Sequence, residues 1–241
     1  GGASALLVAP GGDITLAEKQ AVNAALLASG APISAMNMVR KHLSRVKGGQ
    51  LAAAAHPARM LAMIVSDVPG DDPAFIASGP TVGDRTTPAD ARALLDRWGI
   101  AVPPSVAAVL DGPTGVLSPD DPILDPVENR IVAAPSQSLA AAAEAAEARG
   151  CEVRLLGDAL EGEARDLAAE HAGLALAARS DHPVLLLSGG ECTVTRRGDG
   201  VGGPNAEYAL ALALALDGAP GIHAIACDTD GVDGAAEVAG A

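Results

Sequence analysis

The sequence predicts an α/β fold of two domains, each built on a mostly parallel, helix-covered sheet. Apolar runs of strand length alternate with helical patterns along the chain, which is the order typical of parallel sheets. A stretch with four prolines and no hydrophobic period, residues 112–129, separates two such series. The 241 residues are 49% apolar, enough for two small cores, and aromatic residues make up only 1%, so Ala, Val, Leu and Ile must build them.

The elements of the first domain are predicted from helix caps and apolar spacing. A capping box from Thr15 to Glu18 begins the first helix, whose apolar side is expected to hold Val22, Leu26 and Leu27. The predicted elements are a helix that ends at Gly30, a helix capped by Ser34 that runs to about Val46 before Gly48-Gly49, a short Ala-rich helix, a strand over 60–65, and a helix capped by Thr87 that ends at Gly99.

The second half restarts the alternation. Its predicted elements are a strand over 130–134, a helix over 136–149, a strand over 152–156, a helix over about 161–178, an apolar strand over 182–187, a polar strand over 192–197 and an apolar strand over 222–226. The β-α-β-α-β order favours a parallel sheet covered on both faces, with right-handed crossovers and ligands beyond the carboxyl ends of the strands. We expect domain limits at 1–115 and 130–241, with 116–129 as the linker.

Composition excludes several classes of function. The net charge of −14 and the pI near 4.6 argue against nucleic acid or an anionic membrane surface as a partner. No apolar run reaches the roughly 18 residues that a membrane span needs, so no membrane partner is expected. Three scattered cysteines without C-x-x-C spacing indicate neither a disulfide framework nor a zinc site, and they fit a cytoplasmic location.

A G-x-G-x-x-G pattern occurs at Gly198, Gly200 and Gly203. A dinucleotide fingerprint needs its first glycine directly after a buried central strand. Here the preceding segment, residues 192–197, alternates in polarity and carries two arginines, which weakens the dinucleotide interpretation without eliminating it. No phosphate-binding loop of the G-x-x-x-x-G-K-[ST] type is present in the sequence.

A first group of candidate site residues is cationic and polar. Its members, at helical steps of three and four, are Asn37, Arg40, Ser44 and Lys47. With Lys41 they offer donors suited to a carboxylate or a phosphate, although a string of this kind is also compatible with a solvated helix face. The chain has only three lysines, and two of them lie in this run beside Gly48-Gly49, which favours an anion site.

Two acidic turns follow apolar strands, one in each half. The first holds Asp67, Asp71 and Asp72, and the second holds Asp228, Asp230 and Asp233. Clustered carboxylates fit a hard cation such as Mg²⁺ or a proton-transfer task, whereas Asp72 before Pro73 could simply cap a helix. The second turn lacks the spacing of a calcium-binding EF-hand loop. One acidic turn per domain fits a cleft that holds a metal-bound phosphate between the domains.

Six distinctive runs follow one another over nearly the whole chain: GGASALL, MNMVRKHLSRVKGGQLA, SDVPGDDPAFIASGPT, LSGGECTV, GGPNAEYALALA and DTDGVDGAAEVAGA. Together they resemble the glycerate 2-kinase family of bacteria and animals, whose members also carry the label hydroxypyruvate reductase, with a MOFRL-type C-terminal region from about residue 184. The resemblance implies two α/β domains, the first Rossmann-like, and phosphoryl transfer from ATP, with Mg²⁺, to the 2-hydroxyl of D-glycerate. Because family members extend further at both ends, the chain is expected to be a truncated member.

The resemblance also suggests roles for residues. Arg40 and Lys47 would clamp the anion, and Asp67 would lie near the reacting hydroxyl or the metal. The expected substrate- or nucleotide-binding residues are Ser4, in a possible anion nest, with Asn37, Ser44, Gly189, Gly190, Glu191, Asn205 and Glu207, and the expected metal ligands are Asp71, Asp228 and Asp230. A small-molecule substrate is the expected partner, and a homodimer stays open.

One motif departs from the family pattern. G-R-G-G-R-N-Q-E is replaced by GVGGPNAE from Gly200 to Glu207, so that Pro204 stands where the family has an arginine. Losing arginines beside a triphosphate would remove a few kcal/mol of transition-state stabilisation. Two other functions therefore remain open: an NAD(P)H-dependent hydroxypyruvate reductase, and a non-catalytic remnant that keeps only the scaffold.

Overall fold

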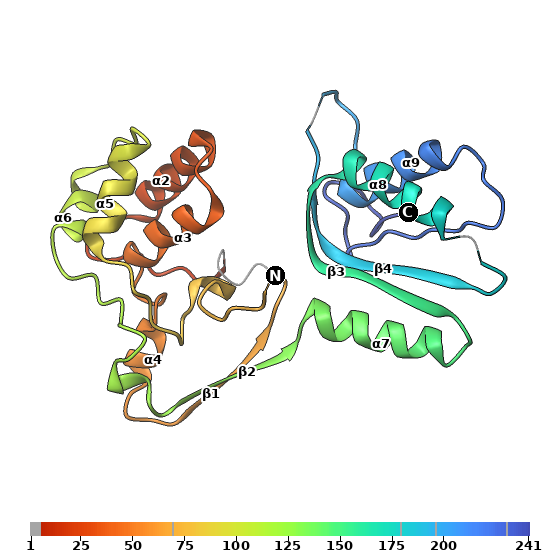
Figure 1. Ribbon diagram of the computed structural model, residues 1–241. Helices are drawn as coiled ribbons and strands as arrows, with labels where there is room; N and C mark the ends of the chain where they lie inside the picture. The colour runs from red at the N-terminus through yellow and green to blue at the C-terminus, as the bar shows by residue number, and fades with distance from the viewer. Residues whose placement is uncertain (1–5, 69, 179, 196, 230) are drawn as a thin grey trace. The chain divides into compact units, whose positions relative to one another are not determined.

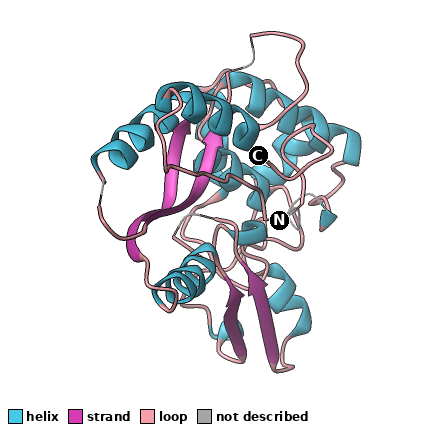
Figure 2. Ribbon diagram, turned by 90° about the vertical axis from the view of Figure 1, so that its right-hand side faces the viewer, coloured by secondary structure: helices cyan, strands magenta, loops and turns pink. Residues whose placement is uncertain are grey.

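The structure, a computed structural model, describes residues 6–68, 70–178, 180–195, 197–229 and 231–241. The chain divides into two compact units, Gly1–Ala134 and Pro135–Ala241. Figure 1 draws the first unit in red to green and the second in green to blue, and Figure 2 shows helices and strands in both. Within these described ranges, the strands form two separate two-stranded sheets, β1-β2 and β3-β4, and both are parallel. The fold is therefore α/β, as the sequence predicts.

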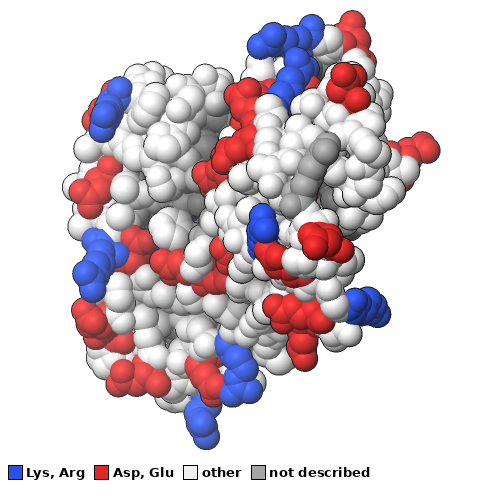
Figure 3. All heavy atoms as spheres, turned by 45° about the vertical axis from the view of Figure 1, so that its right-hand side comes forward, with Lys and Arg blue, Asp and Glu red and all other residues white. Residues whose placement is uncertain are grey.

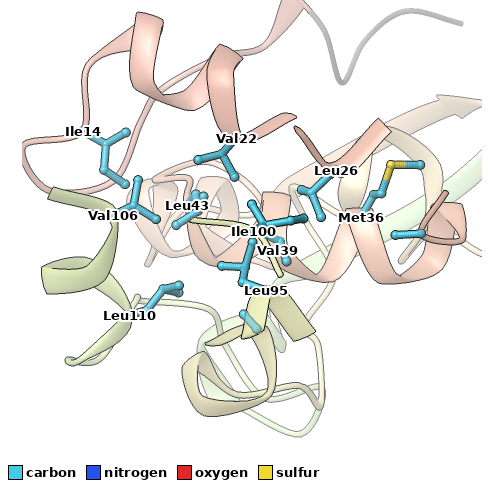
Figure 4. Packing of buried hydrophobic residues seen from close by; sticks show 12 residues of the cluster. Ile14, Val22, Leu26, Met36, Val39, Leu43, Leu95, Ile100, Val106 and Leu110 are labelled. Carbon is cyan, nitrogen blue, oxygen red and sulfur yellow. The ribbon is translucent and has the colours of Figure 1, made fainter. Parts of the chain in front are cut away.

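Helices supply most of the core of the first unit. They are α2 (Leu16–Ser29), α3 (Ile33–His42), α4 (Gln50–Ala55), α5 (Pro88–Arg97) and α6 (Pro104–Leu110), with short 3₁₀ turns η1 (Ile76–Ser78) and η2 (Pro122–Leu124). Side chains of α2, α3, α5 and α6 point toward one another in a closed aliphatic cluster that includes Leu26, Val39, Leu95 and Val106 (Figure 4). Helix α6 was not predicted, because its seven residues are too few to show a period.

Local capping chemistry sets the helix ends that the sequence predicts well. Thr15 and Glu18 form the capping box of α2, and Gly30 ends that helix in the left-handed region at φ 75°. Thr87 likewise caps α5, with Pro88 in the first turn. Along α2, Val22 and Leu26 are buried as predicted, but Leu27 is 57% exposed, so its assignment to the apolar side was wrong.

Helix α3 differs from its prediction at both ends. It starts after Pro32, without a side-chain cap, and ends at His42, so the predicted cap at Ser34 and the end near Val46 were wrong. The helix stops because the backbone turns to other partners. The N–H of Gly11 donates to the Leu43 carbonyl at 3.1 Å, and the N–H of Arg45 donates to the Ala9 carbonyl at 2.9 Å.

The sheet of the first unit pairs two strands that are distant in sequence. β1 (Met60–Val65) lies parallel to β2 (Val127–Ala133), with Met60 opposite Val127. The sequence assigned the strand over 130–134 to the second domain, whereas the structure pairs it with β1. Part of the Pro-rich stretch also packs within the first unit, because the N–H of Leu117 donates to the Gly48 carbonyl at 3.0 Å.

The second unit is a parallel strand pair covered on both faces. It contains α7 (Pro135–Glu147), β3 (Glu152–Glu163), α8 (Ala164–Ala177), β4 (Val184–Thr193) and α9 (Pro204–Leu216). Helix α7 lies on one face of β3 and β4, and α8 and α9 lie on the other (Figure 1). The predicted helix over 161–178 starts later, at Ala164, because residues 161–163 still pair with β4.

Two strand predictions in the second unit were wrong. β4 does not end at residue 187 but continues through Gly189 and Gly190 to Thr193, so the separate polar strand over 192–197 does not form among the described residues. Gly190 is required by packing, because a Cβ there would lie 2.0 Å from the Leu160 carbonyl oxygen. Residues 222–226 do not form a regular strand, and the bonding near Cys227 is limited to a short bridge to Gly240.

Candidate functional site

The first unit gathers positive charge at the end of α3. Arg40, in the last turn of that helix, donates from Nε to Oδ1 of Asn23 on α2 at 2.7 Å and from Nη1 to Oδ1 of Asn37 at 3.2 Å. The two amides hold the guanidinium plane on two of its edges. Burial lowers the pKa of Arg40, which stays charged at any physiological pH.

Lys47 lies in the turn that follows α3 and is only 2% exposed. Its Nζ donates to the Ala77 carbonyl at 3.3 Å. Burial, followed by the positive charges of Lys19 and Arg40, lowers the pKa of Lys47 to about 8. The lysine is therefore mostly charged at pH 7, and Lys19 and Arg40 lie close enough to repel it.

Lys19 was missed by the sequence analysis. It lies half-buried on α2, and its Nζ donates to the carbonyl of Leu43, the residue that ends α3, at 3.0 Å. Burial and then the charge of Arg40 lower its pKa. The available signal was the rarity of lysine together with the i, i+4 spacing of Lys19 and Asn23, which places both on one face of the predicted helix.

The expected helical face of Asn37, Arg40, Ser44 and Lys47 does not exist as such, because α3 ends before Ser44. Asn37 and Arg40 do contact each other. Ser44 is buried, and its hydroxyl oxygen accepts from the Val46 N–H at 3.2 Å, which indicates a role in shaping the turn.

Lys41 was grouped with these residues, but its side chain contacts a different set of residues. Its Nζ forms an ion pair with Asp84 and lies 5.5 Å from the centre of the Phe75 ring. The charge of Lys41 is therefore already compensated.

A cavity of about 570 Å³ lies beside the neighbouring residue, His42. The imidazole is 1% exposed and is hydrogen-bonded to the hydroxyls of Thr114, at 2.7 Å, and Thr86, at 3.1 Å. Burial lowers the pKa of His42, although the charges of Asp84 and Asp90 oppose that effect. The sequence analysis gave this histidine no role, since its two threonine partners come from distant loops.

The acidic turn after β1 has mixed roles. Asp67 is exposed, two residues beyond the end of the strand. Asp71 has a positive φ of 53°. Asp72 accepts the Ala74 N–H at 2.8 Å, which is ordinary capping of a turn. Only Asp67 and Asp71 thus keep the functional interpretation.

In the second unit, Asp233 closes the N-terminus of α9. This carboxylate is 0% exposed and accepts the N–H groups of Asn205, at 2.9 Å, and Ala206, at 2.8 Å. Gly203 permits the approach, because a Cβ there would lie 2.3 Å from Oδ1 of Asp233. Backbone donors that a pyrophosphate would need at this helix start are therefore already bound, which argues against a dinucleotide site at Gly198–Gly203.

The other predicted residues of the second unit have diverse surroundings. The side-chain amide of Asn205 donates to Asp228 at 3.3 Å and to Asp233 at 3.1 Å, and Asp228 itself is exposed. Glu207 forms an ion pair with Arg165 of α8. Glu191 is exposed on β4, opposite Glu161.

Two predicted residues, Ser4 and Asp230, lie outside the described residues. Within the described part, no three His, Cys, Asp or Glu side chains lie together as a protein-only metal cage would require. Mg²⁺ commonly takes only one or two carboxylates and completes its shell with phosphate oxygens and water. The exposed carboxylate of Asp228 fits that limited demand. None of the helices in the described ranges is long and apolar enough to cross a membrane.

Comparisons with known proteins identify the family. Residues 1–111 match the model described as domain of unknown function DUF4147, and residues 184–241 match the MOFRL family. Glycerate kinase of Macaca fascicularis is 36% identical over 289 residues, an alignment that covers 100% of this chain and 72% of that protein. The chain belongs to the glycerate 2-kinase family.

Other relatives agree with this assignment. An Agrobacterium vitis protein with a provisional hydroxypyruvate reductase name is 55% identical over 250 residues, covering 100% of this chain and 56% of that protein. The crystal structure of glycerate kinase from Thermotoga maritima superposes with a TM-score of 0.86 at 35% identity, covering 100% of this chain and 58% of that one. The chain thus spans a little over half the length of these two members of the glycerate 2-kinase family.

Proposed function

We propose that this protein catalyses the ATP-dependent phosphorylation of D-glycerate to 2-phosphoglycerate. The observation that carries the proposal is the group of cations Lys19, Arg40 and Lys47 in a chain of net charge −14. A small hydroxy acid needs such a clamp for its carboxylate, and phosphoryl transfer needs positive charge where negative charge develops. Membership of the glycerate 2-kinase family supports the same reaction.

Each proposed role follows from local chemistry. Arg40, oriented by Asn23 and Asn37, would bind one edge of the substrate anion. Lys47, charged below its pKa of about 8, would bind a second oxygen. Asp67 is exposed at the end of β1, so its carboxylate could accept the proton of the attacking hydroxyl.

ATP and Mg²⁺ are part of the proposal. When bound, Mg²⁺ would neutralise negative charge on the phosphates of ATP. Asp71, Asp228 and Asp230 are the proposed carboxylate ligands, and the proposed residues on the nucleotide side are Ser4, Gly189, Gly190, Glu191, Asn205 and Glu207. Glu207 already pairs with Arg165, and Gly190 is required by strand packing, so these two support the nucleotide role least.

The deciding experiment is a coupled assay of ADP release with D-glycerate, run on this chain and on a full-length version. We expect turnover by the full-length protein, with a loss of about 10²-fold or more in the Asp67→Asn variant. Asp72→Asn is the matched control, because it removes the same charge from a carboxylate that accepts the Ala74 N–H in a turn, and the Asn oxygen can still accept that bond. Unchanged turnover in Asp67→Asn would refute the role of Asp67. No ADP release by the full-length protein would refute the kinase and leave the reductase and the scaffold remnant as alternatives.

The relatives named as hydroxypyruvate reductases motivate a second candidate, NAD(P)H-dependent reduction of hydroxypyruvate. Quenching of nicotinamide fluorescence on titration into the protein would support it. Absence of quenching would exclude the reductase.

A further inference from the structure

Two half-buried cations of the first unit bind only neutral groups among the described residues. Lys19 donates to the Leu43 carbonyl, and Arg40 donates to the amide oxygens of Asn23 and Asn37. Five other cations in the described ranges pair with carboxylates: Lys41, Arg92, Arg130, Arg154 and Arg165.

Acidic residues are not scarce in the chain. The chain has 30 Asp and Glu residues against 16 Lys and Arg residues, and acidic side chains are the more abundant on the face shown in Figure 3. Neutral partners for Lys19 and Arg40 therefore leave their charge available to an anion that is not part of the chain.

Helix α2 orients both cations. Lys19 and Asn23 are one helical turn apart, and both contact the end of α3. Asn23 occupies Nε of Arg40 and Asn37 occupies Nη1, while Nη2 has no hydrogen-bond partner within the described residues. A guanidinium held on two edges presents its third edge without further loss of side-chain entropy.

The cations also act on one another. The charge of Arg40 lowers the pKa of Lys19, and the charges of both lower the pKa of Lys47. Three mutually repelling positive charges cost free energy that a bound anion would offset. One carboxylate brings a single negative charge, whereas a phosphate group alone brings about 1.5 to 2 near pH 7.

We propose that the cation cluster of Lys19, Arg40 and Lys47 binds a phosphorylated hydroxy acid more tightly than the unphosphorylated acid, with Lys19 as the third clamp. The inference rests on the proposed function and deepens it. The site favours the product of the reaction over the substrate, so the product competes with glycerate until a reaction that consumes phosphorylated hydroxy acids removes it.

The test is calorimetric titration of this chain at pH 7, without nucleotide, with D-glycerate, 2-phosphoglycerate and inorganic phosphate. We expect 2-phosphoglycerate to bind at least about tenfold more tightly than D-glycerate, since a hydrogen bond to a charged group contributes that much. Lys19→Met is expected to weaken 2-phosphoglycerate about tenfold and D-glycerate less. Arg97→Gln removes the same charge from an exposed position of the same unit and is expected to change neither.

The inference is overturned by equal affinity for the two acids, by no effect of Lys19→Met beyond that of Arg97→Gln, or by binding of inorganic phosphate as tight as that of 2-phosphoglycerate. Failure to bind any of the three ligands overturns it as well. Circular dichroism of each variant excludes loss of the fold. The titration contains no ATP, so the two proposals can fail separately. Product binding that depends on Lys19, together with no ADP release in the coupled assay, refutes the kinase alone. ADP release without tighter binding of 2-phosphoglycerate refutes only the preference for the product.

Discussion

The two units bury polar groups of opposite charge and use them differently. The first unit buries Lys41, His42 and Lys47 beside an extensive aliphatic core. The second buries Asp233 and has a much smaller core around Ala168, Ala172 and Leu212. Its carboxylate is already committed to the start of α9. The comparison teaches that the first unit keeps buried positive charge that an anionic ligand can use, whereas the buried carboxylate of the second unit already binds backbone N–H groups of its own chain.

The largest expected effect concerns the aliphatic core. Leu26→Ala, at a position 1% exposed, should lower the free energy of unfolding of the first unit by about 3 kcal/mol, because it leaves a cavity among packed neighbours. Leu212→Ala should cost the second unit about half as much, since fewer buried side chains surround it. Chemical denaturation monitored in each unit measures both values. Equal losses would contradict the contrast between the two cores.

The next-largest effect on stability is expected where the backbone of the second unit packs closely, at Gly203. A Cβ on Gly203 would lie 2.3 Å from the carbonyl carbon of Asp233, so Gly203→Ala should cost about 2 kcal/mol and weaken the cap of α9. Gly200→Ala is the control, because no atom lies within 4 Å of a Cβ at that position. Thermal unfolding compares the two variants. Similar melting temperatures would show that the second unit does not depend on this contact.

A third prediction concerns charge in the first unit. Carbon-13 labelling of the lysine Cε atoms should give three signals, one of which titrates with a pKa of about 8 and belongs to Lys47. Lys19→Met should move that pKa upward, because one repelling charge is removed. The signal is assigned with the Lys47→Arg variant, in which the signal of Lys47 should be missing. A titration unaffected by Lys19→Met would contradict the cation cluster.

The same lowered pKa has a consequence for stability. The unfolded chain holds the Lys47 proton up to a pKa near 10.5, whereas the folded chain releases it from about pH 8. The unfolded state binds more protons in that window, so this group makes the free energy of unfolding rise between about pH 8 and 10.5. The rise should be absent in Lys47→Met, as denaturation at pH 7 and pH 9.5 would show.

The smallest effect is expected at the surface of the second unit. Glu207→Gln breaks the ion pair between Glu207, whose side chain is 24% exposed, and Arg165, whose side chain is 51% exposed. The substitution should lower the free energy of unfolding by less than about 1 kcal/mol. Arg165→Gln should give a similar value. A loss of stability larger than that of Gly203→Ala would mean that this ion pair stabilises the second unit more than the close backbone packing at Gly203 does.

Features set by neighbouring residues were predictable from the sequence. The caps of α2 and α5 depend on Thr15, Glu18, Thr87 and Asp90, which lie within three residues of their partners. The end of α3 was not predictable in this way. Residues 43–45 leave the helix because residues 9–11 pair with them, and no local pattern records that contact.

The candidate site was predictable in part, for the same reason. Residue type identified Arg40 and Lys47 as cations of interest, but only the packing of α2 against α3 shows Lys19 and Asn23 beside them. Gly189 and Gly190 were left between two predicted strands, since a glycine required by the backbone of β3 has the same sequence signature as one required by a bend.

The cap of α9 also bears on how the second unit forms during synthesis. Asp233 follows Asn205 by 28 residues, so the ribosome completes the whole of α9 before the carboxylate that caps it has been made. Until then, the first N–H groups of a strongly apolar helix have no Asp233 oxygen to bind, and fraying at that end is favoured. The nascent second unit therefore holds a strongly apolar helix without its cap until Asp233 has been made, and a chaperone can bind the helix during that interval.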